Sequence, residues 1–300
     1  MSVIAIVGPT AAGKSALSLA LAHELDGEVV NADSMQLYRG MDIGTAKLTP
    51  EEREGVAHHV LDIWPVTEPA SVAEYQRLAR AAIDDILARG RVALLVGGSG
   101  LYVRAVLERF EFPGTDAGLR AALEAELAEA GPGPLHARLA ALDPGAAAHI
   151  LPSNGRRIIR ALEVIELTGR AFTATLPDPA PYYPSVQLGV DLDTVALDER
   201  IARRVAHMWR LGLVDEVRAL VGQGLREGRT ASRALGYQQV LRHLAGECTE
   251  EQAAAETVQA TRRFVRRQRS WFRRDPRIRW LDGADPDLAR AASGLLARAQ

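Results

Sequence analysis

The stretch VIAIVGPTAAGKS at residues 3–15 decides the fold of this chain. Its first five residues are apolar and mostly β-branched, which predicts a strand buried on both faces of a parallel sheet. The rest fits the phosphate-binding pattern G-x-x-x-x-G-K-[ST] at every fixed position, and Leu17, Leu21 and Leu25 then repeat with helical spacing. A strand, a glycine-rich loop and a helix start in this order direct backbone N–H groups at an anion.

The loop is therefore predicted to bind the phosphates of a nucleotide or a diphosphate. The Lys14 ammonium would neutralise phosphate oxygens, and the Ser15 hydroxyl would be a ligand for Mg²⁺. A chance glycine-rich turn is the alternative, and the flanking strand and helix argue against it. The predicted phosphate-binding residues are Gly8, Pro9, Thr10, Ala11, Ala12, Gly13, Lys14 and Ser15.

The remaining periodicity predicts an α/β fold with a helical insertion. Apolar strands are expected at residues 28–31 and 92–96, with a helix over 71–89 between them, and this alternation indicates a parallel sheet. Residues 113–184, bounded by proline-rich stretches, show only helical patterns and are predicted to be an all-helical domain. Residues 1–112 and 185–300 would form the core, with a returning strand at 186–192 and helices at 196–211, 213–223, 250–274 and 287–299.

Composition restricts the class of protein. The chain is 47% hydrophobic and 25% charged, which is typical of a globular protein, and no apolar run reaches the ~18 residues of a membrane span. The predicted first strand begins directly after Met1, so we expect no signal peptide and a cytoplasmic location. The single cysteine, Cys248, cannot form an internal disulfide.

Two polar positions follow predicted strands and thus belong to the edge of the sheet where ligands bind. In a functional role, Asp33 would accept a proton or ligate a metal through water. In a structural role, it would form a capping box with Gln36 at the start of a short helix. Residues 97–102 (GGSGLY) lack the acid with which nucleotide hydrolases often organise Mg²⁺ and water, which disfavours a hydrolase but not a kinase.

His58 and His59 are adjacent, so in an extended chain they face opposite sides and do not share a metal.

Positive charge is concentrated near the carboxyl end. Residues 262–279 contain nine arginines and one acid, interleaved with aromatic residues. Arginines that bind phosphates beside aromatic faces that stack are typical of RNA-binding surfaces. The alternatives are a solvated helix face and an amphipathic helix whose aromatic side is buried. We favour a nucleic-acid partner.

Several sequence blocks together resemble the tRNA dimethylallyltransferase family, also called tRNA isopentenyltransferases. The matching blocks occur in family order over nearly the whole chain: GPTAAGKS, NADSMQLYRGMDIGTAK, HHVLDI, LLVGGSGLYVRAV, RRIIRALEV, RIARRVAHMWRLGLVDEV, ALGYQQ and TRRFVRRQRSWFRRD. The resemblance implies a P-loop NTPase-like core with a helical insertion. It also implies a Mg²⁺-dependent transfer of a dimethylallyl group from its diphosphate to N6 of adenosine 37, next to the anticodon, in tRNAs that read codons beginning with U.

The resemblance further assigns roles to residues. Asp33 would be the general base, Ser99 and Arg204 would complete the catalytic set, and Arg200 is a weaker alternative to Arg204 on the diphosphate. The predicted partners are the tRNA anticodon stem-loop and dimethylallyl diphosphate, and we expect a monomer of the short bacterial form. The predicted tRNA-binding residues are Asp33, Ser34, Met35, Gln36, Ser99, Arg120, Arg156, Arg157, Ile158, Ile159, Arg160, Arg233, Ala234, Leu235, Gly236, Tyr237 and Gln238.

Three other functions explain part of the sequence. A small-molecule or nucleotide kinase would use the same loop with ATP, but it leaves the arginine-rich stretch and the insertion unexplained. An adenylate isopentenyltransferase acts on free nucleotides and has less need of an RNA-binding surface. A non-catalytic RNA-binding protein has no need of an intact Lys14, Ser15 and Asp33.

Overall fold

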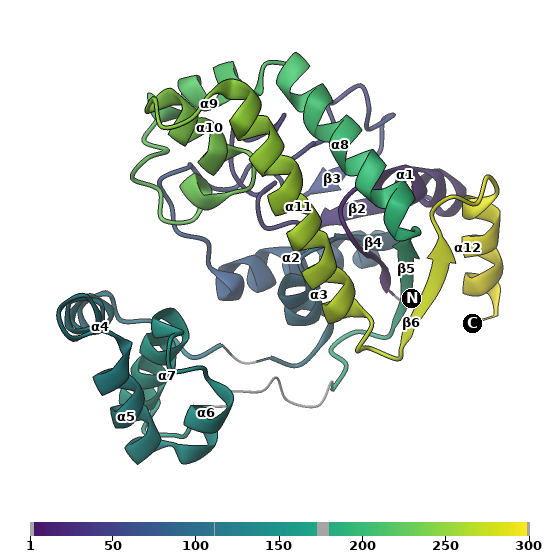
Figure 1. Ribbon diagram of the computed structural model, residues 1–300. Coiled ribbons are helices and arrows are strands. Elements are labelled where there is room, and N and C mark those ends of the chain that lie inside the picture. Colours follow the sequence, from purple (N-terminus) through teal and green to yellow (C-terminus); the bar gives the residue numbers. More distant parts are fainter. Residues whose placement is uncertain (1–2, 111, 173–179, 299–300) are drawn as a thin grey trace. The chain divides into compact units, whose positions relative to one another are not determined.

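The computed structural model describes residues 3–110, 112–172 and 180–298. It divides into two compact units, a core unit comprising Met1–Glu108 and Pro181–Gln300, and a helical unit comprising Arg109–Ala180. The corresponding predicted boundaries were residues 113 and 184. Each unit is described separately below (Figure 1).

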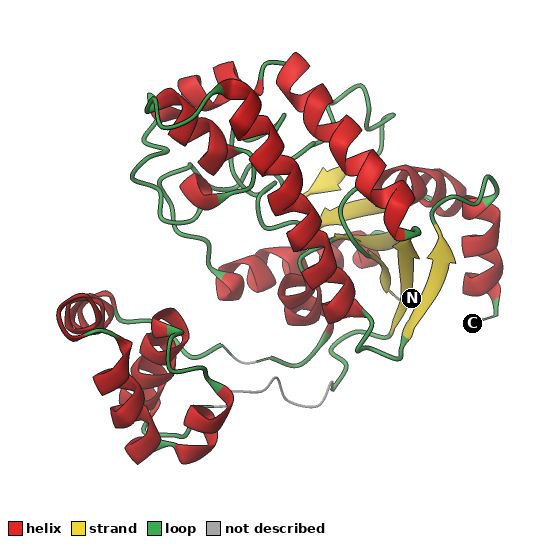
Figure 2. Ribbon diagram, viewed as in Figure 1, coloured by secondary structure: helices red, strands yellow, loops and turns green. Residues whose placement is uncertain are grey.

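The core unit is built on a parallel sheet of six strands in the order β3-β2-β4-β1-β5-β6. Figure 2 shows this sheet with helices on both sides. The predicted first strand lies in the middle, where Ile6 pairs in register with Val96 on one side and Leu188 on the other. The strands are β1 (Val3–Val7), β2 (Gly27–Asn31), β3 (His58–His59), β4 (Val92–Gly97), β5 (Ser185–Asp191) and β6 (Ile278–Asp282).

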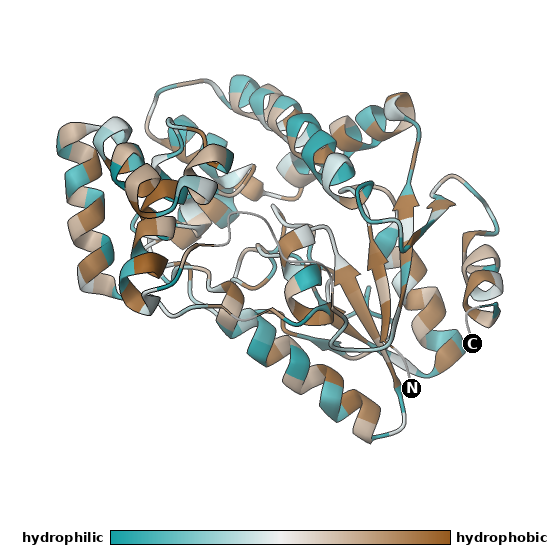
Figure 3. Ribbon diagram, turned by 90° about the horizontal axis from the view of Figure 1, so that it is seen from below, coloured by the Kyte–Doolittle hydropathy of each residue, from teal (hydrophilic) through white to brown (hydrophobic). Residues whose placement is uncertain are grey.

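Side chains of β1 alternate between two hydrophobic cores, because successive residues of a strand point to opposite faces. Val3, Ala5 and Val7 belong to the core that contains residues of α2 (Val72–Ala88) and α3 (Gly100–Leu107). Ile4 and Ile6 belong to the core that contains residues of α1 (Lys14–Leu25) and α12 (Leu288–Ala297). The strands are accordingly hydrophobic along their length in Figure 3. Burial on both faces explains why these strands are continuous apolar runs in the sequence.

Helices also follow β5 in the core unit, whereas residues 32–71 are loops and turns apart from β3. Helices α8 and α11 pack side by side (Figure 1). Thr249 and Gln252 form a capping box at the start of α11. The elements are α8 (Thr194–Arg210), α9 (Leu213–Val221), the short 3₁₀ helix η1 (Ala231–Arg233), α10 (Tyr237–Leu244) and α11 (Glu250–Phe272).

The helical unit has a core of its own. Leu135, Leu139, Ile158 and Leu162 are fully buried within it. Its amphipathic patterns fold as α4 (Ala117–Ala130), α5 (Pro132–Leu142), α6 (Pro144–His149) and α7 (Gly155–Thr168). No described helix of either unit is long and apolar enough to cross a membrane.

Several elements differ from the sequence expectations. Strands β3 and β6 and helices η1 and α10 were not predicted. Strand β6 is an edge strand, and its exposed residues include Arg279 and Trp280, so it lacks the apolar run that marked the central strands. The alternative in which Asp33 and Gln36 form a capping box does not apply, because no helix follows Asp33.

A candidate active site at the carboxyl edge of the sheet

The phosphate loop connects β1 directly to α1, and close backbone packing dictates its glycines. Gly8 has a φ of 137°, and a Cβ atom there would lie 2.1 Å from the Val190 carbonyl oxygen of β5. Only glycine fits this position. Gly13 has a φ of 112° and no atom near the place of a Cβ, so the loop is open on that side. Helix α1 then begins at Lys14, which brings the helix N-terminus to the loop.

Lys14 is held inside the loop rather than paired with an acid. Its Nζ donates to the Pro9 carbonyl oxygen at 2.8 Å. Burial lowers the pKa of Lys14 to about 8, against a smaller opposing effect of the Asp33 carboxylate. A partly desolvated ammonium of this kind gains more from an incoming phosphate than a solvated one does.

Ser15 lies exposed in the first turn of α1. Mg²⁺ is usually held by one or two protein oxygens together with substrate phosphates and water, so a hydroxyl beside a phosphate loop fits this ion. Among the described residues, no group of three or more His, Cys, Asp or Glu could hold a metal ion. The Ser15 hydroxyl beside the phosphate loop suits an ion that arrives with a phosphorylated ligand.

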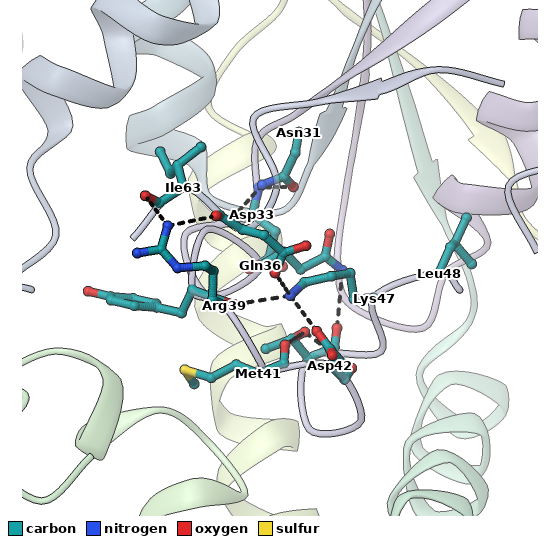
Figure 4. Close-up of polar contacts among 12 residues, drawn as sticks. Asn31, Asp33, Gln36, Arg39, Met41, Asp42, Lys47, Leu48 and Ile63 are labelled. Carbon is teal, nitrogen blue, oxygen red and sulfur yellow. Dashed lines mark hydrogen bonds and ion pairs between the residues drawn. The ribbon is translucent and has the colours of Figure 1, made fainter. Parts of the chain in front are cut away.

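Asp33 follows β2, and a set of hydrogen bonds fixes its backbone (Figure 4). Asn31 accepts from the Asp33 amide at 2.9 Å and donates to the Asp33 carbonyl at 3.0 Å. Asp33 Oδ1 accepts from the Met35 amide at 2.9 Å, and no described group donates to Oδ2. The carboxylate thus has one oxygen that is engaged in a local turn and one that is available to accept a proton.

Two of the three predicted catalytic residues, Asp33 and Arg204, line a cavity of about 320 Å³ in the core unit. Thr10 of the phosphate loop lines it as well. Apolar side chains form much of the remaining wall, among them Met35, Met208 and Phe264. The full lining comprises Thr10, Asp33, Ser34, Met35, Gly44, Thr45, Ile201, Arg204, Val205, Met208, Arg233, Ala234, Leu235, Thr257, Thr261, Phe264 and Arg267.

The two arginines considered for the diphosphate have different surroundings. Both lie on α8, one helical turn apart. Arg204 lines the cavity, donates to the Thr45 carbonyl oxygen at 3.2 Å, and has a pKa lowered by burial. Arg200 donates instead to the Gly283 carbonyl oxygen at 3.4 Å. The two arginines share a face of α8, and their different positions along the helix place Arg204, and not Arg200, among the cavity residues.

Ser99 lies beside the cavity rather than in its described lining. Its hydroxyl accepts from the Ser34 amide at 3.2 Å and lies 3.3 Å from the Ser34 hydroxyl. Ser34 and Met35 line the cavity, whereas Gln36 donates to the Thr45 carbonyl oxygen at 3.2 Å. Ser99 thus contacts the segment that carries Asp33.

The predicted tRNA-binding residues near the 3₁₀ helix separate into exposed and buried ones. Arg233, Ala234 and Leu235 line the cavity, and Gln238 is exposed. Gly236 has a φ of 86° and donates to Gln239 at the start of α10. The Tyr237 side chain is completely buried, so it does not offer the RNA contact that the sequence predicted.

A similar separation occurs in the helical unit. Arg156 and Arg157 are exposed in the first turn of α7. Ile158 and Ile159 are instead buried in the core of this unit, which differs from the predicted RNA contact. Arg120 and Arg160 form ion pairs with the buried Glu163 at 2.5 and 2.7 Å.

The arginine-rich stretch proves to be partly structural. Four of its nine arginines form ion pairs within the core unit, and the others differ in their surroundings. Arg267 lines the cavity close to the ring of Phe264. The ion-paired residues are Arg262 with Asp198, Arg269 and Arg273 with Asp191, and Arg277 with Glu108 and Asp275.

Gln268 is a site residue that sequence reasoning missed. Its side chain is only 5% exposed and joins the phosphate loop to the end of β4. Its Oε1 accepts from the Thr10 amide at 3.0 Å, and its Nε2 donates to the Gly98 carbonyl at 2.9 Å. In the sequence, the arginines around Gln268 were the feature that indicated a function for this stretch. No local pattern predicts that a glutamine binds a loop 258 residues away.

Comparison with known proteins supports a single family. The sequence model of the IPP transferase family matches residues 36–275. The tRNA dimethylallyltransferase of Salinispora arenicola (strain CNS-205) is 80% identical over 291 residues, which are 97% of this chain and 85% of that protein. That of Streptomyces coelicolor is 70% identical over 299 residues, which are 99% of this chain and 96% of that protein.

Solved structures agree with the sequence comparison. The tRNA isopentenylpyrophosphate transferase from Bacillus halodurans is 42% identical, with a TM-score of 0.75 over 99% of this chain and 96% of that one. A eukaryotic dimethylallyltransferase acting on tRNA is 26% identical, with a TM-score of 0.84 over 98% of this chain and 77% of that one.

Proposed function

The chain belongs to the tRNA dimethylallyltransferase (IPP transferase) family, and from this premise we propose that its cavity transfers a dimethylallyl group from dimethylallyl diphosphate to N6 of adenosine 37 in tRNAs that read codons beginning with U. The observation that carries the proposal is that one cavity joins Thr10 of the phosphate loop, Asp33 and Arg204 to apolar walls. The relatives are named tRNA dimethylallyltransferases, which supports this function over the kinase alternative.

The reaction replaces a C–O bond by a C–N bond. The N6 amine attacks C1 of the dimethylallyl group, and the diphosphate leaves with the electron pair of the broken C1–O bond. Negative charge then grows on the diphosphate, where loop amides, Lys14 and Arg204 stabilise it in a partly desolvated site. Mg²⁺ bound at Ser15 and the diphosphate would add to this charge stabilisation.

Asp33 is the proposed general base. An exocyclic adenine amine is a poor nucleophile and must lose one proton as it attacks. The Asp33 carboxylate lines the cavity and has an available oxygen to receive that proton. Met35, Met208 and Phe264 provide apolar contacts for the prenyl chain and exclude water from its developing positive charge.

The target base must leave the anticodon stack to reach this depth, at a cost of a few kcal/mol. Arg233 and Arg267 at the cavity, and Arg156 and Arg157 in the helical unit, are the proposed cationic contacts for the RNA. We place the reaction in the cytoplasm, with a monomer as the active species.

The first experiment incubates the protein with Mg²⁺, labelled dimethylallyl diphosphate and an unmodified anticodon stem-loop. A matched stem-loop with guanosine at position 37 and the Asp33→Ala variant are the controls. We expect label only in the adenosine RNA, and a loss of about 10²–10⁴ in rate with Asp33→Ala. Label in the guanosine RNA, or transfer of phosphate from ATP to a small molecule in its place, would overturn the proposal.

A further inference from the structure

A short loop links the arginine of the cavity to the rest of the core unit. We call residues 42–45 the Thr45 loop, and its Gly44 and Thr45 line the cavity. The Thr45 carbonyl oxygen accepts from Arg204 Nη2 at 3.2 Å and from Gln36 Nε2 at 3.2 Å. Because Arg204 has no described ion pair, this carbonyl is the group that orients its guanidinium.

One carboxylate, Glu216 in the first turn of α9, holds the Thr45 loop in place. Its Oε2 accepts from the amides of Asp42 and Ile43 at 3.1 and 2.7 Å, and its Oε1 accepts from the Gly44 amide at 3.2 Å. Successive backbone amides that converge in this way form an anion site. Here the anion is a side chain of the protein itself, so the site serves to fix the loop.

Tyr237 in turn fixes Glu216. Its hydroxyl donates to Glu216 Oε1 at 2.6 Å, and its ring is completely buried. Burial raises the pKa of Tyr237 well above its usual range, and the neighbouring carboxylate adds to this, so the hydroxyl remains a donor. The ring also packs against Gly44, where a Cβ atom would lie 2.4 Å from it. This packing explains the glycine at that position.

A second anchor, from Lys47, holds the Asp42 side chain at the start of the loop. Lys47 Nζ donates to Asp42 at 2.5 Å, to Asp62 at 2.6 Å and to the Tyr38 carbonyl oxygen at 3.0 Å (Figure 4). The Thr45 loop is therefore held from two sides, and only the Glu216 side reaches the residues that line the cavity.

We propose that Glu216 and Tyr237 are positioning residues that hold Arg204 toward the diphosphate through the Thr45 loop. This inference rests on the proposed function of the cavity. It assigns to Tyr237 a role in orienting the diphosphate ligand, in place of the RNA contact predicted from the sequence. Tyr237 acts through Glu216, and Glu216 acts through the Thr45 carbonyl oxygen.

The test is a double-mutant cycle between Glu216→Gln and Arg204→Ala, measured as kcat/KM for dimethylallyl diphosphate at saturating RNA. Glu216→Gln removes the charge and leaves at least one loop amide without its acceptor, and we expect about a tenfold loss. In the Arg204→Ala background the same change should cost threefold or less. Asp215→Asn, an exposed neighbour on α9, is the matched control and should be silent.

Tyr237→Phe keeps the buried ring and removes only the hydroxyl, so it serves if Glu216→Gln does not fold. We expect a three- to tenfold loss of kcat/KM, an unchanged KM for the RNA, and little further loss when it is combined with Glu216→Gln. Losses that multiply fully with Arg204→Ala would overturn the inference. An inactive wild-type protein would instead overturn the proposed function, whereas an active wild type with silent variants would overturn this inference alone.

Discussion

Two cations of the candidate active site, Lys14 of the phosphate loop and Arg204 of the cavity, are held differently from those of the helical unit. Lys14 and Arg204 donate to the carbonyl oxygens of Pro9 and Thr45, and within the described part of the chain neither forms an ion pair. Arg120 and Arg160 instead pair with Glu163, whose side chain is 0% exposed. A carbonyl oxygen orients a cation and leaves its charge uncompensated, whereas a carboxylate neutralises it.

The pKa shifts follow this difference. Burial lowers the pKa of both Lys14 and Arg204, and the nearby Asp33 carboxylate offsets this only in part. Burial would by itself raise the pKa of Glu163, but hydrogen bonds from Arg120 and Arg160 outweigh it and the net shift is downward. Burying Lys14 and Arg204 without an ion pair thus lowers the stability of the core unit and leaves their charges free for an anionic ligand. In the helical unit, the arginines instead stabilise the fold through Glu163.

The largest effect should come from removing an uncompensated cation. Arg204→Ala deletes a guanidinium that stabilises the leaving diphosphate, and we expect kcat/KM for the prenyl donor to fall by about 10²–10³. Thermal unfolding should change little, because no acid loses its partner. Steady-state kinetics with labelled donor and circular dichroism measure the two quantities.

Arg200→Ala is the matched control for this prediction. It lies on the same helix and donates to Gly283 rather than facing the cavity. We expect a change in kcat/KM of at most a few fold. Equal losses of kcat/KM for the two variants would mean that both arginines reach the diphosphate. The different surroundings of Arg200 and Arg204 would then have no effect on catalysis.

The next effect should be on stability and should be confined to the helical unit. Glu163→Gln leaves Arg120 and Arg160 without their carboxylate, and we expect a loss of about 2–3 kcal/mol, since both arginines keep some contact with water. Hydrogen exchange of the α4 and α7 amides measures it. Glu166→Gln, whose carboxylate pairs with Arg138 at the surface, should cost less than 1 kcal/mol. Similar losses in both variants would contradict the comparison.

The fold was predictable where local patterns were strong. The strand and loop at residues 3–15, the helix at α2 and the returning strand β5 all carry an apolar rhythm that reports burial directly. Strand β6 carries none, because an edge strand that exposes Arg279 and Trp280 depends on pairing with β5. Such pairing is a non-local property that periodicity does not contain.

The site was predictable to a different extent. The loop residues, Asp33 and Arg204 stand in motifs, whereas Gln268 and Glu216 act on backbone groups of distant segments. A hydrogen bond to a backbone amide places no demand on the identity of the residue that carries the amide. The buried Tyr237 shows the converse, because a residue inside a recognised motif was assigned to the RNA while it serves the interior.

The core unit also contains cations that pair with a buried carboxylate, Glu28, and they allow a third test of the comparison. Glu28 at the start of β2 is buried and accepts hydrogen bonds from Arg89, Arg91 and His59, and the bonds from Arg89 contribute most to holding its pKa well below its usual range. A carboxyl with a lowered pKa in the folded state stabilises the protein above its unfolded pKa of about 4.3 and loses that effect as pH falls.

Glu28→Gln should therefore cost about 2 kcal/mol at pH 7, a difference that shrinks as pH falls below about 4. Urea unfolding at several pH values measures it. Asp85→Asn is the control, because this exposed carboxylate shares Arg89 and should contribute little. A Glu28→Gln difference that is constant down to pH 3 would show that the pairing does not stabilise the fold.

The smallest effect, and the most direct measure of an uncompensated cation, is the titration of Lys14. Its pKa of about 8 means that the free enzyme loses this charge above pH 8, so kcat/KM for the donor should fall about tenfold per pH unit beyond that point. A bound diphosphate restores the charge, so the fall in kcat should occur at higher pH than the fall in kcat/KM. Lys14→Arg, which stays protonated, should be less active but flat from pH 7 to 9.5. If kcat/KM of Lys14→Arg still falls above pH 8, a group other than Lys14 titrates there. The contrast between cations with and without an ion pair would then not extend to the phosphate loop.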